Sequence, residues 1–216
     1  VFILQSIMQY NGAALVSMAG KDCIAIASDT RFGIQQQTVA TNMKKIFKIN
    51  DKTMIVMTGL ISDMQTLANK FKYRQNLYEM GEGREMKCNV FANMVSQMLY
   101  EKRFGPYFME PVIAGLQEEK NDDGSLRYEP FLCGMDLLGA PVYTKDFMVA
   151  GTTSDELHGV CEAMYRPDLA PEDLFETISQ CLLAAQDRDC LAGWGAVVHI
   201  ITPTGIITRE LKARQD

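Results

Sequence analysis

The order in which strand-like and helical stretches follow one another constrains the fold of this chain most strongly. Strand-like alternation covers residues 13–57, two helical stretches follow, strands return, a second helical pair follows, and strands close the chain. Because the helices come in adjacent pairs, the pattern argues against a doubly wound parallel sheet. It predicts the α+β class, a four-layer αββα sandwich: two antiparallel sheets packed face to face, each covered outside by two helices.

The expected helices have apolar faces and recognisable ends. Gly81 and Gly83 are expected to stop the first helix, and Gly105–Pro106 the second. Ser154 is expected to cap the third, and Pro171 lies in the first turn of the fourth. The four helices are predicted at residues 62–80, 89–103, 154–165 and 171–187.

The predicted strands are short and bounded by turn residues. The turns are expected at Ala19–Asp22, Asn50–Asp51, Asn121–Gly124, Leu138–Pro141 and Pro203–Gly205. The strands are expected at residues 13–18, 23–28, 37–40, 45–49, 53–57, 111–117, 128–135, 147–150, 196–202 and 206–211. The first two and the last two are interpreted as hairpins.

Length and composition fit a single globular domain. The chain has 216 residues, of which 47% are hydrophobic and 22% charged, which excludes a disordered or collagen-like chain. No linker or short repeat divides it, so residues 13–216 are expected to form one domain behind a leader of residues 1–12. The net charge is −6 and no stretch is strongly basic, which excludes a nucleic-acid partner.

The first twenty residues carry no charge, which raises the question of a signal peptide or a membrane span. A signal peptide needs a basic segment before its apolar stretch, and none is present. Polar residues such as Gln5, Gln9 and Asn11 interrupt the apolar run too early for a membrane-spanning helix. We therefore expect no membrane partner, and an extended leader that feeds a buried strand.

Neither a metal nor a cofactor is expected. The six cysteines form no C-x-x-C pair and are interpreted as buried free thiols in a reducing compartment. The only histidines, His158 and His199, lack ligand spacing, and His199 is interpreted as a packed strand residue. Gly193-x-Gly195 opens a strand, the reverse of a dinucleotide-binding turn.

A dispersed group of residues carries the candidate chemistry. Asp29 ends one predicted strand, Lys45 begins another, and Thr58–Gly59 ends a third, where a main-chain N–H could face a ligand. A lysine beside an aspartate could activate a nucleophile, or the two could form an ion pair that ties strands together. The triplet Asp187–Asp189 could pair carboxylates, but a solvated or salt-bridged helix end is the simpler interpretation.

Several long strings resemble the β-type subunits of the 20S proteasome, which are N-terminal nucleophile hydrolases. The strings are CIAIASDTR at 23–31, KKI at 44–46, MTGL at 57–60, DRD at 187–189 and GWG at 193–195. The resemblance covers essentially the whole chain. Further strings, YEKRFGPY at 100–107, EPVIAGL at 110–116, LFETISQ at 174–180 and LKAR at 211–214, favour one non-catalytic paralogue.

The resemblance implies a threonine at the new N-terminus of active members, freed by cleavage behind a glycine. The spacing that the family keeps before Asp29 places Ala13 there, directly after Gly12. Alanine has no hydroxyl with which to attack a carbonyl or to cleave the leader. The nucleophile is therefore expected to be missing, and the leader is expected to stay attached.

The supporting residues of the family are retained only in part. Asp29, Lys45 and Asp189 match its charged residues, and Gly59 matches the glycine whose N–H forms the oxyanion hole. Ala192 replaces a serine of the family. A Gly-Ser-Gly turn of the family is replaced by residues 151–153, Gly-Thr-Thr. The vestigial site is therefore expected to consist of Ala13, Asp29, Lys45, Gly59 and Asp189, with Asp29 and Lys45 as a structural ion pair.

The implied role is architectural. The resemblance implies a non-catalytic subunit that fills a place in a heptameric β ring, two of which stack between outer α rings, in the cytoplasm and nucleus. Its partners would be other α- and β-type subunits, whose chamber it would wall. The turn from Asp136 to Gly139 is expected to line a neighbouring subunit's substrate pocket.

Two alternatives belong to different functional classes. The first is a hydrolase that uses another nucleophile, such as Ser17, Thr30 or Cys23, although Ser17 and Cys23 lie within or at the start of predicted strands and offer no free α-amino base. The second is a free-standing binding module on the same sandwich, which would elute as a small protein on size exclusion.

Overall fold

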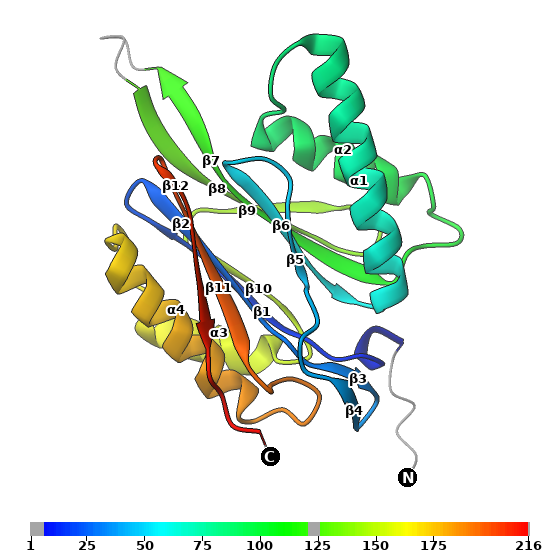
Figure 1. The fold of residues 1–216 in the computed structure, drawn as a ribbon, viewed down its shortest axis with the longest axis vertical. Helices are drawn as coiled ribbons and strands as arrows, with labels where there is room; N and C mark the ends of the chain where they lie inside the picture. Colours follow the sequence, from blue (N-terminus) through cyan, green and yellow to red (C-terminus); the bar gives the residue numbers. More distant parts are fainter. Residues whose placement is uncertain (1–6, 121–125, 216) are drawn as a thin grey trace.

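Two five-stranded antiparallel sheets form the centre of the computed structural model, which describes residues 7–120 and 126–215 (Figure 1). The first sheet has the order β10-β1-β2-β11-β12 and the second β5-β6-β7-β8-β9. The strands of the first sheet are β1 Ala14–Gly20, β2 Cys23–Asp29, β10 Phe147–Gly151, β11 Ala196–Thr202 and β12 Gly205–Leu211. Those of the second are β5 Ile46–Lys48, β6 Thr53–Gly59, β7 Met109–Lys120, β8 Leu126–Met135 and β9 Pro141–Thr144.

A pair of helices covers the outer face of each sheet, as the sequence predicts (Figure 1). α1 and α2 lie on the second sheet, and α3 and α4 on the first. Their bounds are α1 Ile61–Glu82, α2 Cys88–Tyr100, α3 Ser154–Met164 and α4 Pro171–Gln186. Within the described residues, no helix is both long and apolar enough to span a bilayer.

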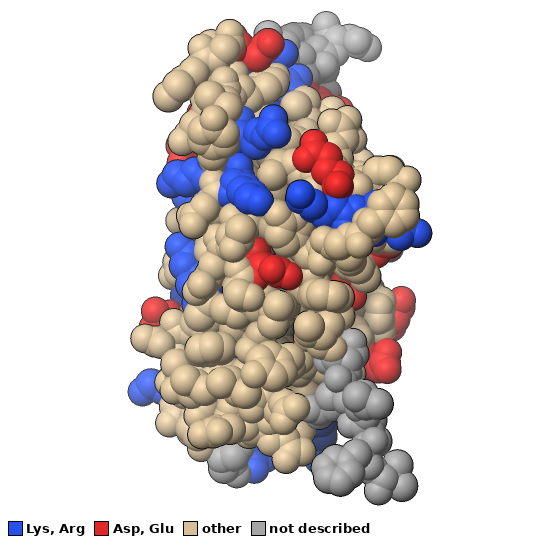
Figure 2. Space-filling view, turned by 90° about the vertical axis from the view of Figure 1, so that its right-hand side faces the viewer, with Lys and Arg blue, Asp and Glu red and all other residues tan. Residues whose placement is uncertain are grey.

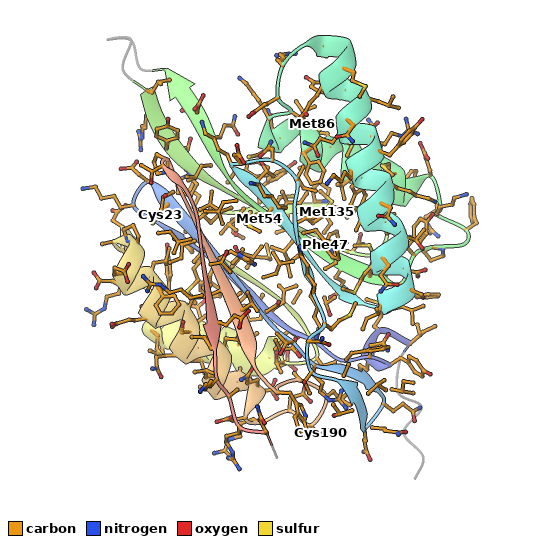
Figure 3. All side chains as sticks on the ribbon, viewed as in Figure 1. Cys23, Phe47, Met54, Met86, Met135 and Cys190 are labelled. Carbon is orange, nitrogen blue, oxygen red and sulfur yellow. The ribbon has the colours of Figure 1, made fainter. Side chains whose placement is uncertain are left out.

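Three apolar layers hold the sandwich together. One lies between the two sheets and contains Met54, and another lies under α1 and α2 and contains Met86 and Met135 (Figure 3). The third lies between the first sheet and α3 and α4, and contains Cys23. β1, β2 and β6 are buried along their whole length, as expected for strands covered on both faces.

Several local predictions need correction. Ser154 is the first residue of α3 and not its cap, because the capping position is taken by Thr153, whose side chain makes no cap hydrogen bond. Gly81 lies inside α1, and only Gly83, in the left-handed region at φ 67°, ends that helix. The leader is not extended throughout, since Ile7–Gln9 form a short 3₁₀ helix, η1.

The sequence patterns missed two short strands, β9 and β3 (Phe32–Ile34). β3 pairs only with β4 (Gln37–Ala40) as a small separate sheet, which leaves no long apolar alternation to detect. β9 is an edge strand that begins at a proline, a position that Pro tolerates. The predicted turn at residues 121–124 lies outside the described residues.

The surface on the side of α1 is uneven in charge. Figure 2 shows Lys and Arg side chains gathered over the upper half of that face, whereas the lower half is mostly uncharged. The charged side chains of this face are therefore concentrated in its upper half, where Asp and Glu lie among the Lys and Arg.

Candidate functional site

A buried ion pair connects the ends of three strands. Lys45 precedes β5, Asp29 ends β2, and Lys45 Nζ lies 2.6 Å from Asp29 Oδ1. Both side chains are almost fully buried. The Asp29 carboxylate also accepts hydrogen bonds from Ala14 N at 3.0 Å and from Gly193 N at 3.3 Å. One carboxylate thus fixes the start of β1, the start of β5 and the loop before β11.

The environment of Lys45 opposes its positive charge. Burial lowers the pKa of Lys45 below its usual value, and Asp29 partly offsets that effect. The ammonium group also donates to the Gly12 carbonyl at 3.3 Å. The lysine therefore has charge-assisted partners on both sides, and its amine faces the peptide bond that precedes Ala13.

Thr152 contacts Ala13 directly, and Asp189 contacts Thr152. Thr152 N donates to the Ala13 carbonyl at 2.8 Å, and Ala13 N donates to Thr152 Oγ1 at 3.4 Å. The Thr152 hydroxyl in turn lies 2.5 Å from Asp189 Oδ2. Asp189 is therefore not a solvated helix end, because it positions the threonine that contacts Ala13.

Two glycines allow the main chain to close around Ala13. Gly151 has φ 105°, and a Cβ there would lie 2.2 Å from the Ala13 carbonyl oxygen. Gly12 has φ 70°, and a Cβ there would lie 2.1 Å from the Leu191 carbonyl oxygen. Neither position can accept a side chain without moving main chain, so glycine is required at both.

Known proteins resemble this chain over nearly its whole length. A family model described as "Proteasome subunit" matches residues 9–201. The chain belongs to the proteasome subunit family. A protein named "Proteasome subunit beta type-3" from Dictyostelium discoideum is 54% identical over 98% of this chain and 100% of its own length. Proteins of the same name from Picea mariana and Drosophila melanogaster are 54% and 49% identical over the same shares.

These comparisons confirm the resemblance that the sequence strings indicate. The four-layer arrangement of two sheets and two helix pairs is likewise the sandwich expected of a proteasome subunit. The name shared by the relatives is that of a single β-type paralogue, in agreement with the strings at 100–107 and 174–180.

Three further residues are predicted for the site or its surroundings, and the structure places them in three different environments. Gly59 ends β6 beside Thr58, whose hydroxyl would lie 3.4 Å from a Cβ at Gly151, so β6 reaches the same cluster. Ala192 is buried in the apolar layer under α4. Asp136 is exposed in the turn between β8 and β9, and it does not join the cluster.

The alternative nucleophiles are poorly placed for catalysis. Ser17 is fully buried and its hydroxyl donates to Ala25 O at 2.8 Å. Cys23 is buried as well, and that burial raises the pKa of its thiol to about 11, which disfavours the reactive thiolate. Thr30 lies inside the chain and its N–H donates to the Gly195 carbonyl at 3.2 Å, so it offers no free α-amino base.

Sequence reasoning missed two residues that contact this region. The Arg31 guanidinium is buried and donates to Leu191 O at 2.9 Å and Gln35 O at 3.1 Å. Asn11 is also buried and bonds to two separate elements. Arg31 lies two residues after Asp29 in the string 23–31. A charged residue so close to the end of a buried strand is the sequence feature that could have indicated its role. Asn11 has no such feature.

A cavity of about 430 Å³ opens beside Lys45, between β5 and the edge formed by β11 and β12. Lys44, His199 and Glu210 are among its lining residues. His199 is half-buried, and burial and Lys44 lower its pKa. Nowhere in residues 7–120 and 126–215 do three His, Cys, Asp or Glu side chains gather closely enough to hold a metal ion.

Proposed function

We propose that this chain is a non-catalytic structural β subunit of the 20S proteasome core particle. One observation carries the proposal: the residue enclosed by Lys45, Asp29 and the Thr152–Asp189 pair is Ala13, which has only a methyl group. The name of the relatives, Proteasome subunit beta type-3, supports membership of the β type.

The chemistry of Ala13 supports a subunit that does not cleave peptides. The residue has no hydroxyl, and its nitrogen is part of the peptide bond to Gly12, so no free amine is present to act as a base. Loss of the nucleophile in a hydrolase removes on the order of 10⁶ of the rate. Asp29, Lys45, Gly59 and Asp189 are then a vestigial site whose remaining role is structural.

The architectural role follows from the same proposal. The chain would occupy one position in a heptameric β ring, stacked on a second β ring between outer α rings, and would wall the chamber in which neighbouring subunits cleave. The leader would stay attached, because self-cleavage needs the missing hydroxyl. The subunit would be located in the cytoplasm and nucleus.

A mechanism-based label tests the missing nucleophile. The assembled particle is treated with a peptide epoxyketone, which reacts with an N-terminal threonine hydroxyl and amine, and each subunit is weighed by mass spectrometry. We expect adducts on active neighbours and none on this chain, whose intact mass and N-terminal sequence should include residues before Ala13. An adduct on this chain, or a start at a hydroxyl- or thiol-bearing residue, would contradict the proposal.

Asp136 is proposed to shape the substrate pocket of an adjacent subunit. Its Oδ1 accepts from Leu138 N at 2.9 Å and from Ala140 N at 2.8 Å, so the carboxylate also holds the turn in shape. A second acid, Glu110, lies near Asp136. Burial and the charge of Asp136 raise the pKa of the Glu110 carboxyl group. The exposed Asp136 carboxylate would present negative charge at this turn, which would favour basic substrates.

Two substitutions separate charge from turn geometry at Asp136. Asp136→Asn keeps an oxygen acceptor for both N–H groups, whereas Asp136→Ala removes it. We expect both variants to slow cleavage after basic residues by a neighbouring site, by about fivefold, because loss of one exposed charge contact is worth up to about 1 kcal/mol. Unchanged rates and preferences at every neighbouring site in both variants would refute the pocket-lining role.

A further inference from the structure

The cavity of about 430 Å³ beside Lys45 lies at one side of the sandwich. Its lining includes residues of β5 and β12, which are edge strands of the two sheets. The volume falls within the range of about 300–1,000 Å³ that is typical of pockets for small ligands. Of the vestigial-site residues, Lys45 alone contributes to the lining. The cavity is therefore a second candidate site, separate from the surroundings of Ala13.

The strands β11 and β12 present one continuous face to this cavity. Their register places Val197 opposite Glu210 and His199 opposite Thr208. Because alternate residues of a strand share a face, these four side chains lie on the same side of the first sheet. All four line the cavity. Its apolar lining residues are Met43, Ile46, Trp194, Ala196, Val197 and Leu211.

Two charged side chains of the lining have no ion-pair partner. His199 Nδ1 and Thr208 Oγ1 lie 2.8 Å apart and satisfy each other. Lys44 and Glu210, in contrast, form no salt bridge within the part of the chain that the structure describes. Lys44 precedes β5 of the second sheet, whereas Glu210 lies on β12 of the first. The cavity thus offers one positive and one negative group, contributed by different sheets.

Trp194 lines the same cavity in a conformation that is unusual for its residue type. It lies between Gly193 and Gly195 with φ 63°, in the left-handed region. Residues with a Cβ rarely adopt this region, and those held there by their surroundings cluster at ligand-binding sites. The indole ring is half-buried, so it retains an apolar surface against which the side chain of a ligand can pack.

We propose that this cavity binds a short peptide that has free termini and an apolar side chain. The peptide carboxylate would pair with Lys44, its ammonium group with Glu210, and its side chain would pack against Trp194. A free amino acid carries both charges on one carbon, whereas a peptide separates them and can meet partners from two sheets. Binding itself does not depend on the proposed function, and only the source of such peptides, cleavage by neighbouring subunits, rests on it.

Fluorescence of the full chain tests the binding directly. Trp194 is the only tryptophan in the sequence, so its emission reports on this cavity. The probe is leucylphenylalanine, compared with its N-acetylated form, its C-terminal amide and free phenylalanine. We expect a saturable change in emission with the dipeptide, and binding about fivefold weaker when either end is blocked, because an exposed ion pair contributes up to about that factor.

Two protein variants identify the partner of each peptide end. In Lys44→Met, the dipeptide should bind about fivefold more weakly, and blocking its carboxylate should then have no further effect. In Glu210→Gln, the same should hold for the blocked amino group. Lys145→Met and Glu176→Gln are the matched controls, because both residues are exposed and lie outside the lining. These controls should bind every ligand as the wild type does.

Trp194→Gly tests the indole ring without distorting the loop, because glycine adopts φ 63° freely. Calorimetry should show binding of the dipeptide at least about tenfold weaker than in the wild type. Three results would each overturn the inference: no saturable change in wild-type emission at millimolar dipeptide, equal affinity for phenylalanine, or equal effects of blocking in the wild type and both charge variants. None of these measurements involves cleavage, so a failure here leaves the missing nucleophile untouched, and an epoxyketone adduct would contradict the proposed function alone.

Discussion

At the scale of single residues, the Asp29–Lys45 ion pair joins the starts of β1 and β5 to the end of β2. Asp29 accepts from Lys45, Ala14 and Gly193, and Lys45 also donates to Gly12. Replacement of either charge would leave the other buried, which is far more costly than the loss of an exposed ion pair. The fold therefore depends on both residues to join its strands.

Asp29→Asn is expected to lower the free energy of unfolding by about 3–5 kcal/mol, because it leaves the Lys45 ammonium buried without its anion. The difference in unfolding free energy between the wild type and this variant should become smaller as the pH rises toward 9. Asp29 raises the pKa of Lys45 against the effect of burial, so the substitution lowers that pKa further. Between the folded pKa and the usual 10.5, the unfolded state binds more protons, and stability then increases with pH.

Urea unfolding at several pH values measures this effect, and the double variant Asp29→Asn, Lys45→Met is the control. The double variant has no buried lysine, so its loss of unfolding free energy relative to wild type should be smaller than that of Asp29→Asn. That loss should also not follow the pH dependence expected for the single variant. A loss of less than about 1 kcal/mol in Asp29→Asn, independent of pH, would show that the pair is not a structural anchor.

At the scale of elements, the sequence predicts those parts whose periodicity is long and whose ends carry a distinctive residue. β11 and the helix that begins at Pro171 lie where the pattern predicts them, because alternation and a proline in the first turn act locally. β3 is three residues long and gives no periodic signal. The contact of Asn11 with Ile61, fifty residues apart, is set by tertiary packing that no local pattern reports.

The same distinction applies to the site. Ala13, Asp29 and Lys45 could be placed together because their spacing matches a known family, and the ion pair is then observed. The role of Asp189 through Thr152 could not be read from the string 187–189, where a solvated helix end is the simpler interpretation. The hydrogen bond depends on β10 passing beside β1, which is a property of sheet order.

Alanine substitutions at two glycines compare the contact between β10 and Ala13 with the helix propensity of an exposed position. Gly151→Ala is expected to destabilise the fold by about 3 kcal/mol or more, since its positive φ disfavours a side chain and the new Cβ would meet the Ala13 carbonyl. Gly159 lies exposed inside α3, with no atom within 4 Å of a Cβ added there. Gly159→Ala is therefore expected to stabilise by about 0.5–1 kcal/mol.

Urea unfolding of the two variants in parallel checks both expectations. Equal effects, or a gain in stability at Gly151, would mean that the main chain around Ala13 can move apart without cost. It would then be wrong to interpret the close contact between β10 and the residue before β1 as a fixed feature of the site.

At the scale of the whole molecule, the apolar layers that build the sandwich also enclose most of its thiols. All six cysteines are free, and five are buried, whereas Cys190 is exposed in the loop after α4, which corrects the expectation that all are buried (Figure 3). Burial also raises the pKa values of Cys23, Cys88 and Cys133, so both access and ionisation oppose their reaction.

The folded chain should therefore react with an aromatic disulfide reagent at one thiol, Cys190, and the urea-unfolded chain at all six. Titration at pH 8 counts the reactive thiols by the coloured thiolate released, and Cys190→Ser should reduce the native count to zero without changing the unfolding midpoint. A reducing agent should leave that midpoint unchanged in the wild type, because no disulfide contributes to stability. Rapid native reaction of a second thiol in Cys190→Ser would mean that one apolar layer opens locally, because a buried thiol can react only from an opened state.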